Sequence, residues 1–277
     1  MRASRLFALA LTAVSSAAIS AAAAEPNLLP HRAVYDLSLE QASDRSGING
    51  ISGRMVYEFA GSACEGYTTT FRFVMRLETD EASRLSDQQT TTYEDGKGEV
   101  FQFVNKMYLD NMLDREVKGV ARLEGDETLV ELSKPERRSE TLEATQFPVQ
   151  HMIEVLEKAA DGGGFYQTTL YDSSEDADRV MMTSVTIGQP KPMEEGDAEK
   201  QAAAPLDNQS YWPVSIAYFD PGNERGETLP DYDIGFLLHE SGVTRSLDMN
   251  YGEFSIRGQL VDLTLFDTAE EEADCAQ

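Results

Sequence analysis

An alternation of apolar and polar residues, repeated along most of the chain, constrains the fold more than any other feature of the sequence. In residues 231–239 the apolar side chains fall at every second position: Tyr232, Ile234, Phe236 and Leu238. A period of two is typical of a β-strand with one buried face. Ser241-Gly242 then offers a tight turn, and the alternation resumes through residues 243–251, with Arg245 as the charged exception in the apolar phase. The stretch predicts a β-hairpin.

The next segment, residues 254–265, changes phase partway along. Phe254, Ile256 and Leu260 share one phase, whereas Val261, Leu263 and Leu265 share the other. A β-bulge or bend near residues 258–260 would turn both sets toward the same side of a sheet. We therefore predict one long, bent strand.

The same alternation extends through the first half of the chain. It is most regular in residues 67–77, where six odd-numbered positions are inward candidates: Tyr67, Thr69, Phe71, Phe73, Met75 and Leu77. Asp95-Gly96 is a hairpin signal, since type I′ turns need positive φ at both central positions. About 12 to 14 short antiparallel strands follow from such patterns, and a sheet of that size usually curls or closes. We predict a mainly β protein built on one large curled sheet, a barrel, half-barrel or spiral.

One amphipathic helix interrupts the strands. Pro148 suits a first helical turn, the apolar residues Val149, Met152, Ile153 and Leu156 share a face, and glycines 162–164 end the pattern. We expect this helix to lie against the concave side of the sheet, with His151 facing outward. Residues 188–208 are rich in proline and charge, which predicts a mobile loop inside a single domain of residues 25–277.

The N-terminus has the pattern of a secretory signal peptide over residues 1–24. Arg2 and Arg5 precede a short apolar run, and Ala22-Ala23-Ala24 offers a cleavage site. The apolar run is shorter than the roughly 20 residues of a membrane anchor. We therefore expect export, most simply to the periplasm of a Gram-negative bacterium. The net charge of −26 argues against nucleic acid as a partner.

Cys64 and Cys275 are the two cysteines of the chain. In an oxidising compartment such a pair is best interpreted as one structural disulfide. The spacing is not that of a redox dithiol. A disulfide would attach the acidic C-terminal tail to the first third of the chain.

No catalytic constellation emerges from the sequence, so we predict that the protein is not an enzyme and needs no cofactor or metal. His31, His151 and His239 are far apart, and we expect ordinary surface or hydrogen-bonded roles for them. Residues 172–178 resemble a calcium loop but lack the required glycine and glutamate. Carboxylate pairs such as Glu94-Asp95 and Asp231-Asp233 are unavoidable among 49 acidic residues. Trp212, Tyr218 and Phe219 fit either core packing or a ligand groove.

A family resemblance is carried by motifs in order along the chain: HRAVYDLSL, RMVYEF, CEGYTTTFRF, YEDGKG, KGVA, FPVQHM, YWPVSIAYF and LPDYDIGFLLHESGVTRSLDMNYGEFSIRGQL. Together they resemble the EipB-like periplasmic cell-envelope-integrity proteins of alphaproteobacteria. The resemblance implies a β-spiral similar to the lipoprotein carrier LolA, to LolB and to RseB. It also implies a Cys64–Cys275 disulfide, a role in stress resistance of the envelope, and a periplasmic partner built of helical repeats. The sequence departs from the family pattern in the 188–208 segment.

Two functional hypotheses remain. The first is a monomeric, non-enzymatic protein that binds a lipid, an acyl chain or a partner segment on a concave β surface. The second is an envelope hydrolase that acts on peptidoglycan or glycan through a carboxylate pair.

Overall fold

The computed structural model describes residues 26–174, 176–220 and 229–267. Every described strand belongs to one 14-stranded antiparallel sheet. The strands of its first half are β1 (His31–Ala42), β2 (Ile48–Ser62), β3 (Gly66–Thr79), β4 (Ser83–Glu94), β5 (Val100–Leu109), β6 (Met112–Glu124), β7 (Glu127–Lys134) and β8 (Arg138–Glu143). Those of the second half are β9 (Gly164–Leu170), β10 (Met181–Ile187), β11 (Tyr211–Phe219), β12 (Tyr232–His239), β13 (Thr244–Asn250) and β14 (Phe254–Leu265). The predicted fold class, one large curled antiparallel sheet with a single main helix, is confirmed.

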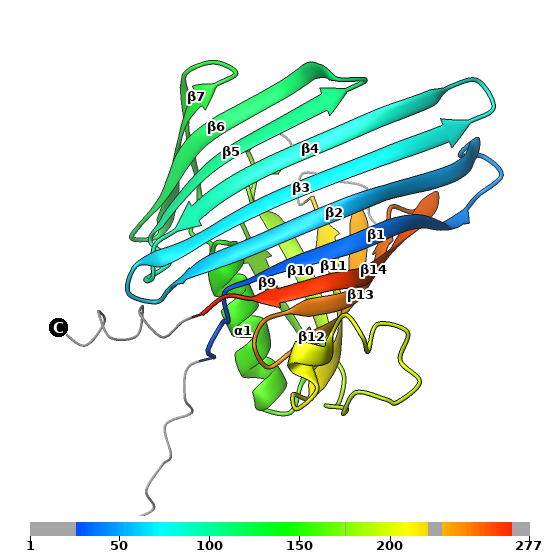
Figure 1. The fold of residues 1–277 in the computed structure, drawn as a ribbon. Helices are drawn as coiled ribbons and strands as arrows, with labels where there is room; N and C mark the ends of the chain where they lie inside the picture. The colour runs from blue at the N-terminus through cyan, green and yellow to red at the C-terminus, as the bar shows by residue number, and fades with distance from the viewer. Residues whose placement is uncertain (1–25, 175, 221–228, 268–277) are drawn as a thin grey trace, which may run out of the picture.

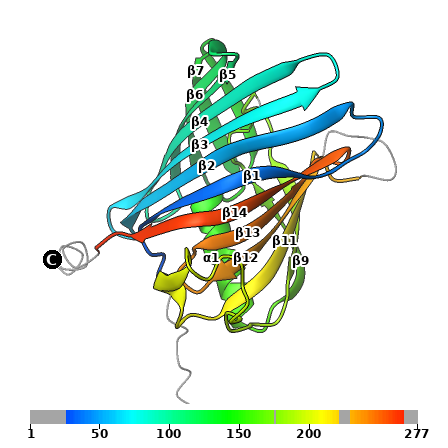
Figure 2. The same ribbon diagram turned by 45° about the vertical axis from the view of Figure 1, so that its right-hand side comes forward.

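The order of the strands explains how the sheet curls. It runs from β8 down to β1, continues through β14 down to β9, and so ends at two strands that are consecutive in sequence. The helix α1 (Pro148–Ala160) connects these two edge strands. Figures 1 and 2 show the two halves of the sheet facing each other, with α1 between them. The result is an open barrel that the helix helps to fill.

The two sheet edges meet at one point just beyond β8. Gln146 forms a parallel bridge with Leu170, and the backbone N–H of Tyr171 donates to the Gln146 carbonyl at 3.0 Å. The Thr145 hydroxyl lies 2.9 Å from that of Thr169. These bonds satisfy polar groups that an open edge would otherwise leave unpaired.

Helix α1 begins at Pro148, as predicted, and its cap comes from the sheet. Both oxygens of the Glu94 carboxylate, on β4, accept backbone N–H groups of the first turn, from Val149 at 2.8 Å and Gln150 at 3.0 Å. Those N–H groups have no partner inside the helix. Burial raises the pKa of Glu94 to about 7. This glutamate is therefore a structural cap.

The prediction that His151 faces outward is wrong, because the side chain is 4% exposed. The helix lies inside the curl, so more than one of its sides is covered. The buried part of the helix surface is therefore wider than the stripe formed by its apolar residues.

Two hydrophobic clusters hold the fold together. The larger joins α1 to the inner faces of β1–β3 and of β10–β14. The smaller packs the inner faces of β5–β7 against Phe147 and Tyr171, the residues that flank the meeting point of the edges. The inner faces use alternate residues, as the sequence pattern predicts. β14 is bent as predicted, but the register shift lies at Val261 rather than at residues 258–260. Val261 is left out of the pairing with β1 and is 40% exposed, so the prediction that it turns inward is wrong.

The β4–β5 hairpin exists where predicted, but with a different turn. It spans residues 95–99, and the residue with positive φ is Gly98, at 68°, rather than Gly96. The Asp95 carboxylate accepts the N–H groups of Glu99 and Val100, both at 2.7 Å. A longer loop with a side-chain cap thus replaces the two-residue type I′ turn.

Residues 188–208, predicted to be a mobile loop, are fastened to the sheet at several points. The segment contains a 3₁₀ turn, η1 (Ala204–Leu206), and Ala203 and Leu206 are fully buried. Its strongest anchor is Glu199, which accepts N–H groups from Ser246 at 3.2 Å and Leu260 at 2.7 Å. Arg245, 1% exposed, donates to the same carboxylate at 3.2 Å.

The buried Arg245 is the center of a larger polar group. Its Nε donates to His239 Nε2 at 2.9 Å, its Nη1 lies 2.8 Å from Asp197, and its guanidinium lies 4.8 Å from the center of the Tyr211 ring. Arg245, the one charged residue among the alternating apolar positions of residues 243–251, is thus buried and paired. Burial lowers the pKa of His239 to about 4, and the Arg245 charge acts in the same direction.

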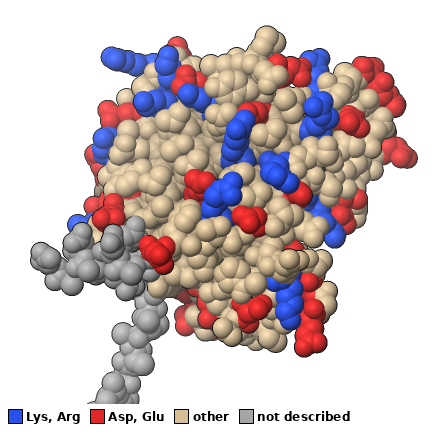
Figure 3. All heavy atoms as spheres, viewed as in Figure 1, with Lys and Arg blue, Asp and Glu red and all other residues tan. Residues whose placement is uncertain are grey.

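The outer face of the sheet is polar and carries both charges. Figure 3 shows basic and acidic side chains interspersed over β1–β4 and β14. Several of them form ion pairs, including Arg54–Asp36 at 2.6 Å and Arg257–Glu40 at 2.6 Å. Among the described helices, none has the length and apolarity needed to cross a bilayer.

The predicted disulfide and signal peptide fall largely outside the described residues. Cys64 lies in the turn between β2 and β3, whereas Cys275 and residues 1–25 are not described. The pairing and the cleavage site stay predictions.

Candidate functional site: an apolar cavity inside the curled sheet

The main candidate site is a cavity of about 420 Å³ enclosed between the two halves of the sheet and α1. Apolar and aromatic groups dominate its walls. The aromatic and aliphatic lining residues are Leu28, Tyr57, Phe59, Phe71, Phe101, Pro148, Val149, Met152, Leu170, Ile216, Tyr218, Tyr232, Ile234 and Phe236. A concave, mostly apolar cavity with a few polar groups is the usual form of a small-molecule site.

The alternation of residues along the strands builds these walls. Tyr57, Phe71 and Thr90 face one another in register across β2, β3 and β4. On the opposite wall, the cavity follows β12 from Tyr232 to Phe236. Four residues of strand correspond to about 13 Å. The cavity therefore extends for about 13 Å along β12.

His31 supplies one polar group near the Leu28 side of the cavity. It is 3% exposed, and its Nδ1 lies 2.7 Å from the Leu29 carbonyl oxygen. Since a carbonyl only accepts, Nδ1 carries the proton and Nε2 is an acceptor. Burial lowers the pKa of His31, so the imidazole is neutral at pH 7.

His151 supplies a second neutral imidazole. Its Nε2 lies 3.4 Å from the hydroxyl of Thr183, on β10. Burial lowers the pKa of His151 to about 4. Both histidines that line the cavity are thus uncharged hydrogen-bonding groups.

Asp172 is the one carboxylate in the cavity wall. It follows β9, and its Oδ1 accepts the backbone N–H of Ser174 at 2.8 Å. Burial raises the pKa of Asp172. Nearby are Tyr218 and Tyr232, whose rings stack at 4.5 Å. Burial, and to a lesser extent the Asp172 charge, raises the pKa of both phenols.

No lysine or arginine lines this cavity in the described part of the chain. An anion inside it would lose its hydration without gaining a cationic partner. The described residues also contain no cluster of three or more histidine, cysteine or acidic side chains suited to a metal ion. Among the described residues, the cavity wall is thus apolar and aromatic, with neutral hydrogen-bonding groups and one carboxyl.

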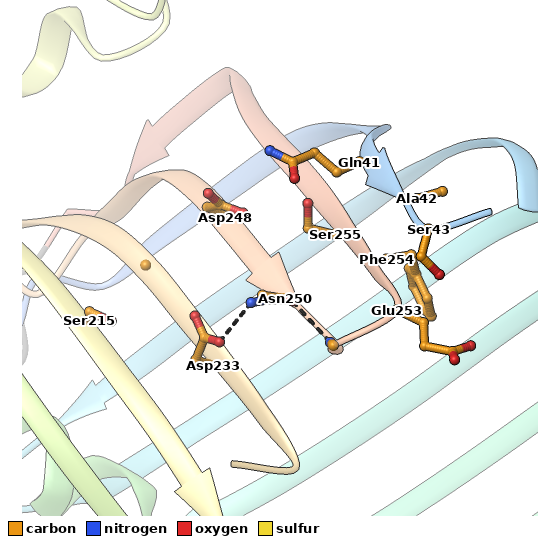
Figure 4. Close-up of a pocket in the computed structure, with 12 residues that line it drawn as sticks. Gln41, Ala42, Ser43, Ser215, Asp233, Asp248, Asn250, Glu253, Phe254 and Ser255 are labelled. Carbon is orange, nitrogen blue, oxygen red and sulfur yellow. Dashed lines mark hydrogen bonds between the residues drawn. The ribbon is translucent and has the colours of Figure 1, made fainter. Parts of the chain in front are cut away.

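A second concavity lies on the outer face of the sheet over β11–β14. Its volume is about 520 Å³, and Asp233, Asp248, Asn250 and Ser215 are among its lining residues. Figure 4 shows Asp233 and Asp248 on neighbouring strands, with the Asn250 amide donating to Asp233 at 3.0 Å. Burial raises the pKa of Asp233. This groove is polar where the inner cavity is apolar.

The sequence-predicted residues are distributed between these features. The three histidines stay apart, although His31 and His151 line the same cavity. Glu94 caps α1 and Asp95 caps a turn, so that pair is structural. Asp231 accepts the N–H of Asp220, and only Asp233 of the second pair lines the outer groove. Trp212 belongs to the main core.

Asp172 lines the cavity, although the sequence pattern indicates it only as part of an imperfect calcium loop, residues 172–178. Its position directly after the alternating strand that ends at Leu170 was the available signal. What places it inside the barrel is the packing of Tyr171 and Ala177 in the smaller core.

An open antiparallel sheet of 14 strands with a helix in its interior defines a class of β-barrel-like proteins. Comparison with known proteins identifies the family. The profile of the EipB-like family matches residues 22–267, and the chain belongs to that family. It is 50% identical over 262 residues to the cell envelope integrity protein EipB of Brucella abortus (strain 2308), covering 94% of this chain and 92% of that protein.

A solved structure agrees with the fold. It is described as a beta-barrel-like protein of a domain of unknown function from Brucella abortus. It superposes with a TM-score of 0.84 at 51% identity, covering 87% of this chain and 99% of the other. The protein is thus a homologue of a cell-envelope-integrity protein.

Proposed function

We propose that this protein is a non-enzymatic periplasmic component that supports envelope integrity by holding a lipid or acyl ligand in the cavity of the curled sheet. The observation that carries the proposal is the apolar cavity of about 420 Å³. At the roughly 30 Å³ that one water occupies, it has room for about fourteen water-sized groups. That is enough for an acyl chain of about a dozen carbons.

Membership of the family supports the envelope role, since the 50% identical relative is a cell envelope integrity protein. The signal-peptide pattern and the two cysteines support the periplasm. A segment of a helical-repeat partner, the kind of partner that the family resemblance implies, is an alternative occupant of the concave surface. The occupied form would be a monomer, because the ligand and not a second copy would cover the apolar walls.

Filling the cavity tests the proposal. Thr90 lines it, whereas the adjacent Thr91 is exposed on the outer face of β4. We expect Thr90→Trp to occupy the space of the ligand and Thr91→Trp to leave it free. Native mass spectrometry of protein from a periplasmic preparation should show a co-purifying lipid with the wild type and Thr91→Trp, and little with Thr90→Trp. Equal lipid on all three proteins would place the lipid outside the cavity.

The hydrolase alternative has one observation in its favour. Asp233, with its raised pKa, and Asp248 share the polar outer groove, and a protonated and an ionised carboxyl are the two groups of many glycosidases. Turnover of isolated sacculi that disappears in Asp233→Asn, and persists in the exposed control Asp262→Asn, would establish an enzyme. We expect no turnover by any of these proteins.

A further inference from the structure

We propose that the cavity selects an amphiphile whose head is an alkylammonium group, held at Asp172 beside the stacked tyrosines Tyr218 and Tyr232, and that it excludes anionic heads. This inference rests on the proposed function, because it assumes that the cavity holds the apolar chain of the ligand. It adds the chemical class of the head group and the residues that recognise it.

The charges of the lining residues carry the first step. Of the side chains that face the cavity, two are neutral histidines, one is the Asp172 carboxylate and none is a lysine or arginine. A phosphate or carboxylate head would therefore lose its hydration and meet only neutral groups and a like charge. Asp172 is the one acidic side chain among the described residues of the cavity wall, and a cation beside it would favour the ionised form of a carboxyl whose pKa burial raises.

The aromatic surroundings of Asp172 carry the second step. Tyr218 and Tyr232 line the same cavity as Asp172, and their rings stack at 4.5 Å. Aromatic rings beside a carboxylate are the composition that binds quaternary ammonium groups, which gain from the ring quadrupoles as well as from the charge.

The rings also connect this place to the surface. Tyr232 stacks with Tyr251 at 6.1 Å, and Tyr251 with Phe254 at 5.2 Å. Tyr251 is 39% exposed. Tyr218 and Tyr232 are thus the inner members of a row of stacked rings that reaches the partly exposed Tyr251.

Asp172→Asn is a suitable variant because it removes the charge and keeps the turn. The bond from the Ser174 N–H goes to Oδ1, which the asparagine carbonyl can replace. Asp176→Asn is the matched control. It removes the same charge from an exposed position in the same segment, 3.7 Å from Arg115.

The probes are dodecyltrimethylammonium, 1-dodecanol and dodecanoate, titrated calorimetrically below their micellar concentrations. We expect the wild type and Asp176→Asn to bind the ammonium probe at least about tenfold more tightly than dodecanoate, and Asp172→Asn to lose that preference. In Thr90→Trp the cavity is filled, so any binding of the ammonium probe that remains measures its attraction to the acidic surface outside the cavity.

The outcomes separate the two proposals. If all three probes bind the wild type equally and Thr90→Trp abolishes that binding, the cavity binds acyl chains but the assignment of the head is wrong. A preference for the cation that survives in Asp172→Asn or in Thr90→Trp also overturns it, since the charge would then act elsewhere. If no probe binds in the cavity, the proposed function fails and the inference with it.

Discussion

At the scale of single residues, His151 is a titratable side chain that lies inside the fold. His151 falls outside the apolar stripe of its helix, yet it is as buried as the core. Burial of an imidazole without a strong partner favours the neutral form, and the pKa falls to about 4 although Glu154 acts in the opposite direction. The stability of the fold should therefore depend on the protonation of this residue.

The sign of that dependence follows from proton counts. Between pH 6.5 and pH 4 the unfolded chain protonates His151 and the folded chain does not, so the free energy of unfolding falls as the pH falls. From pH 7 to pH 5 we expect a loss of about 2 kcal/mol from this residue. Urea unfolding of the wild type and of His151→Phe at both pH values measures it. The variant should lose less stability on acidification.

The comparison between the two proteins is needed because other buried groups titrate in the same range. His239, also lowered to about 4, adds to the acid sensitivity. Glu94, raised to about 7, acts in the opposite direction, since the folded state binds its proton more tightly than the unfolded state. The same change in stability with pH in both proteins would show that His151 has an ordinary pKa.

At the scale of elements, the strands and the helix could be predicted, and the anchoring of residues 188–208 could not. Strand alternation and the pattern from Pro148 to the terminal glycines depend on neighbours in sequence. Glu199 instead meets Arg245 and Leu260, 46 and 61 positions away. A segment rich in charge and proline gives no local sign that one of its glutamates is buried.

This anchor predicts a large effect of one substitution. Glu199→Ala would leave Arg245 with less countercharge and two backbone N–H groups without their acceptor. Removing one member of a buried ion pair typically costs about 3–5 kcal/mol. Thermal unfolding should show a much lower midpoint for Glu199→Ala and nearly no change for Glu195→Ala, which removes an exposed charge from the same segment. Similar midpoints for the two variants would mean that the anchor contributes little.

At the scale of the whole molecule, the order of strands pairs the first strand, β1, with the last, β14. Leu265, the last residue of β14, pairs with His31, and His31 pairs with Phe59. Two strand spacings of about 4.8 Å separate Leu265 from Phe59. Cys64 lies in the turn that follows β2, and ten residues separate Leu265 from Cys275. At about 3.3 Å per extended residue, that length is sufficient for the predicted disulfide to form.

This arrangement leads to a prediction about the covalent closure of the fold. A disulfide between Cys64 and Cys275 closes a loop of roughly 210 residues, which on the chain-entropy model stabilises the folded state by up to about 5 kcal/mol. We expect Cys64→Ser, Cys275→Ser and the double variant to show the same lowered thermal midpoint, because each one removes the same bond. Reductant should lower the midpoint of the wild type to that of the variants and leave the variants unchanged. Free-thiol titration of the exported protein that finds two reactive sulfhydryls, or a wild-type midpoint that reductant does not alter, would show that the two ends are held together by the sheet alone.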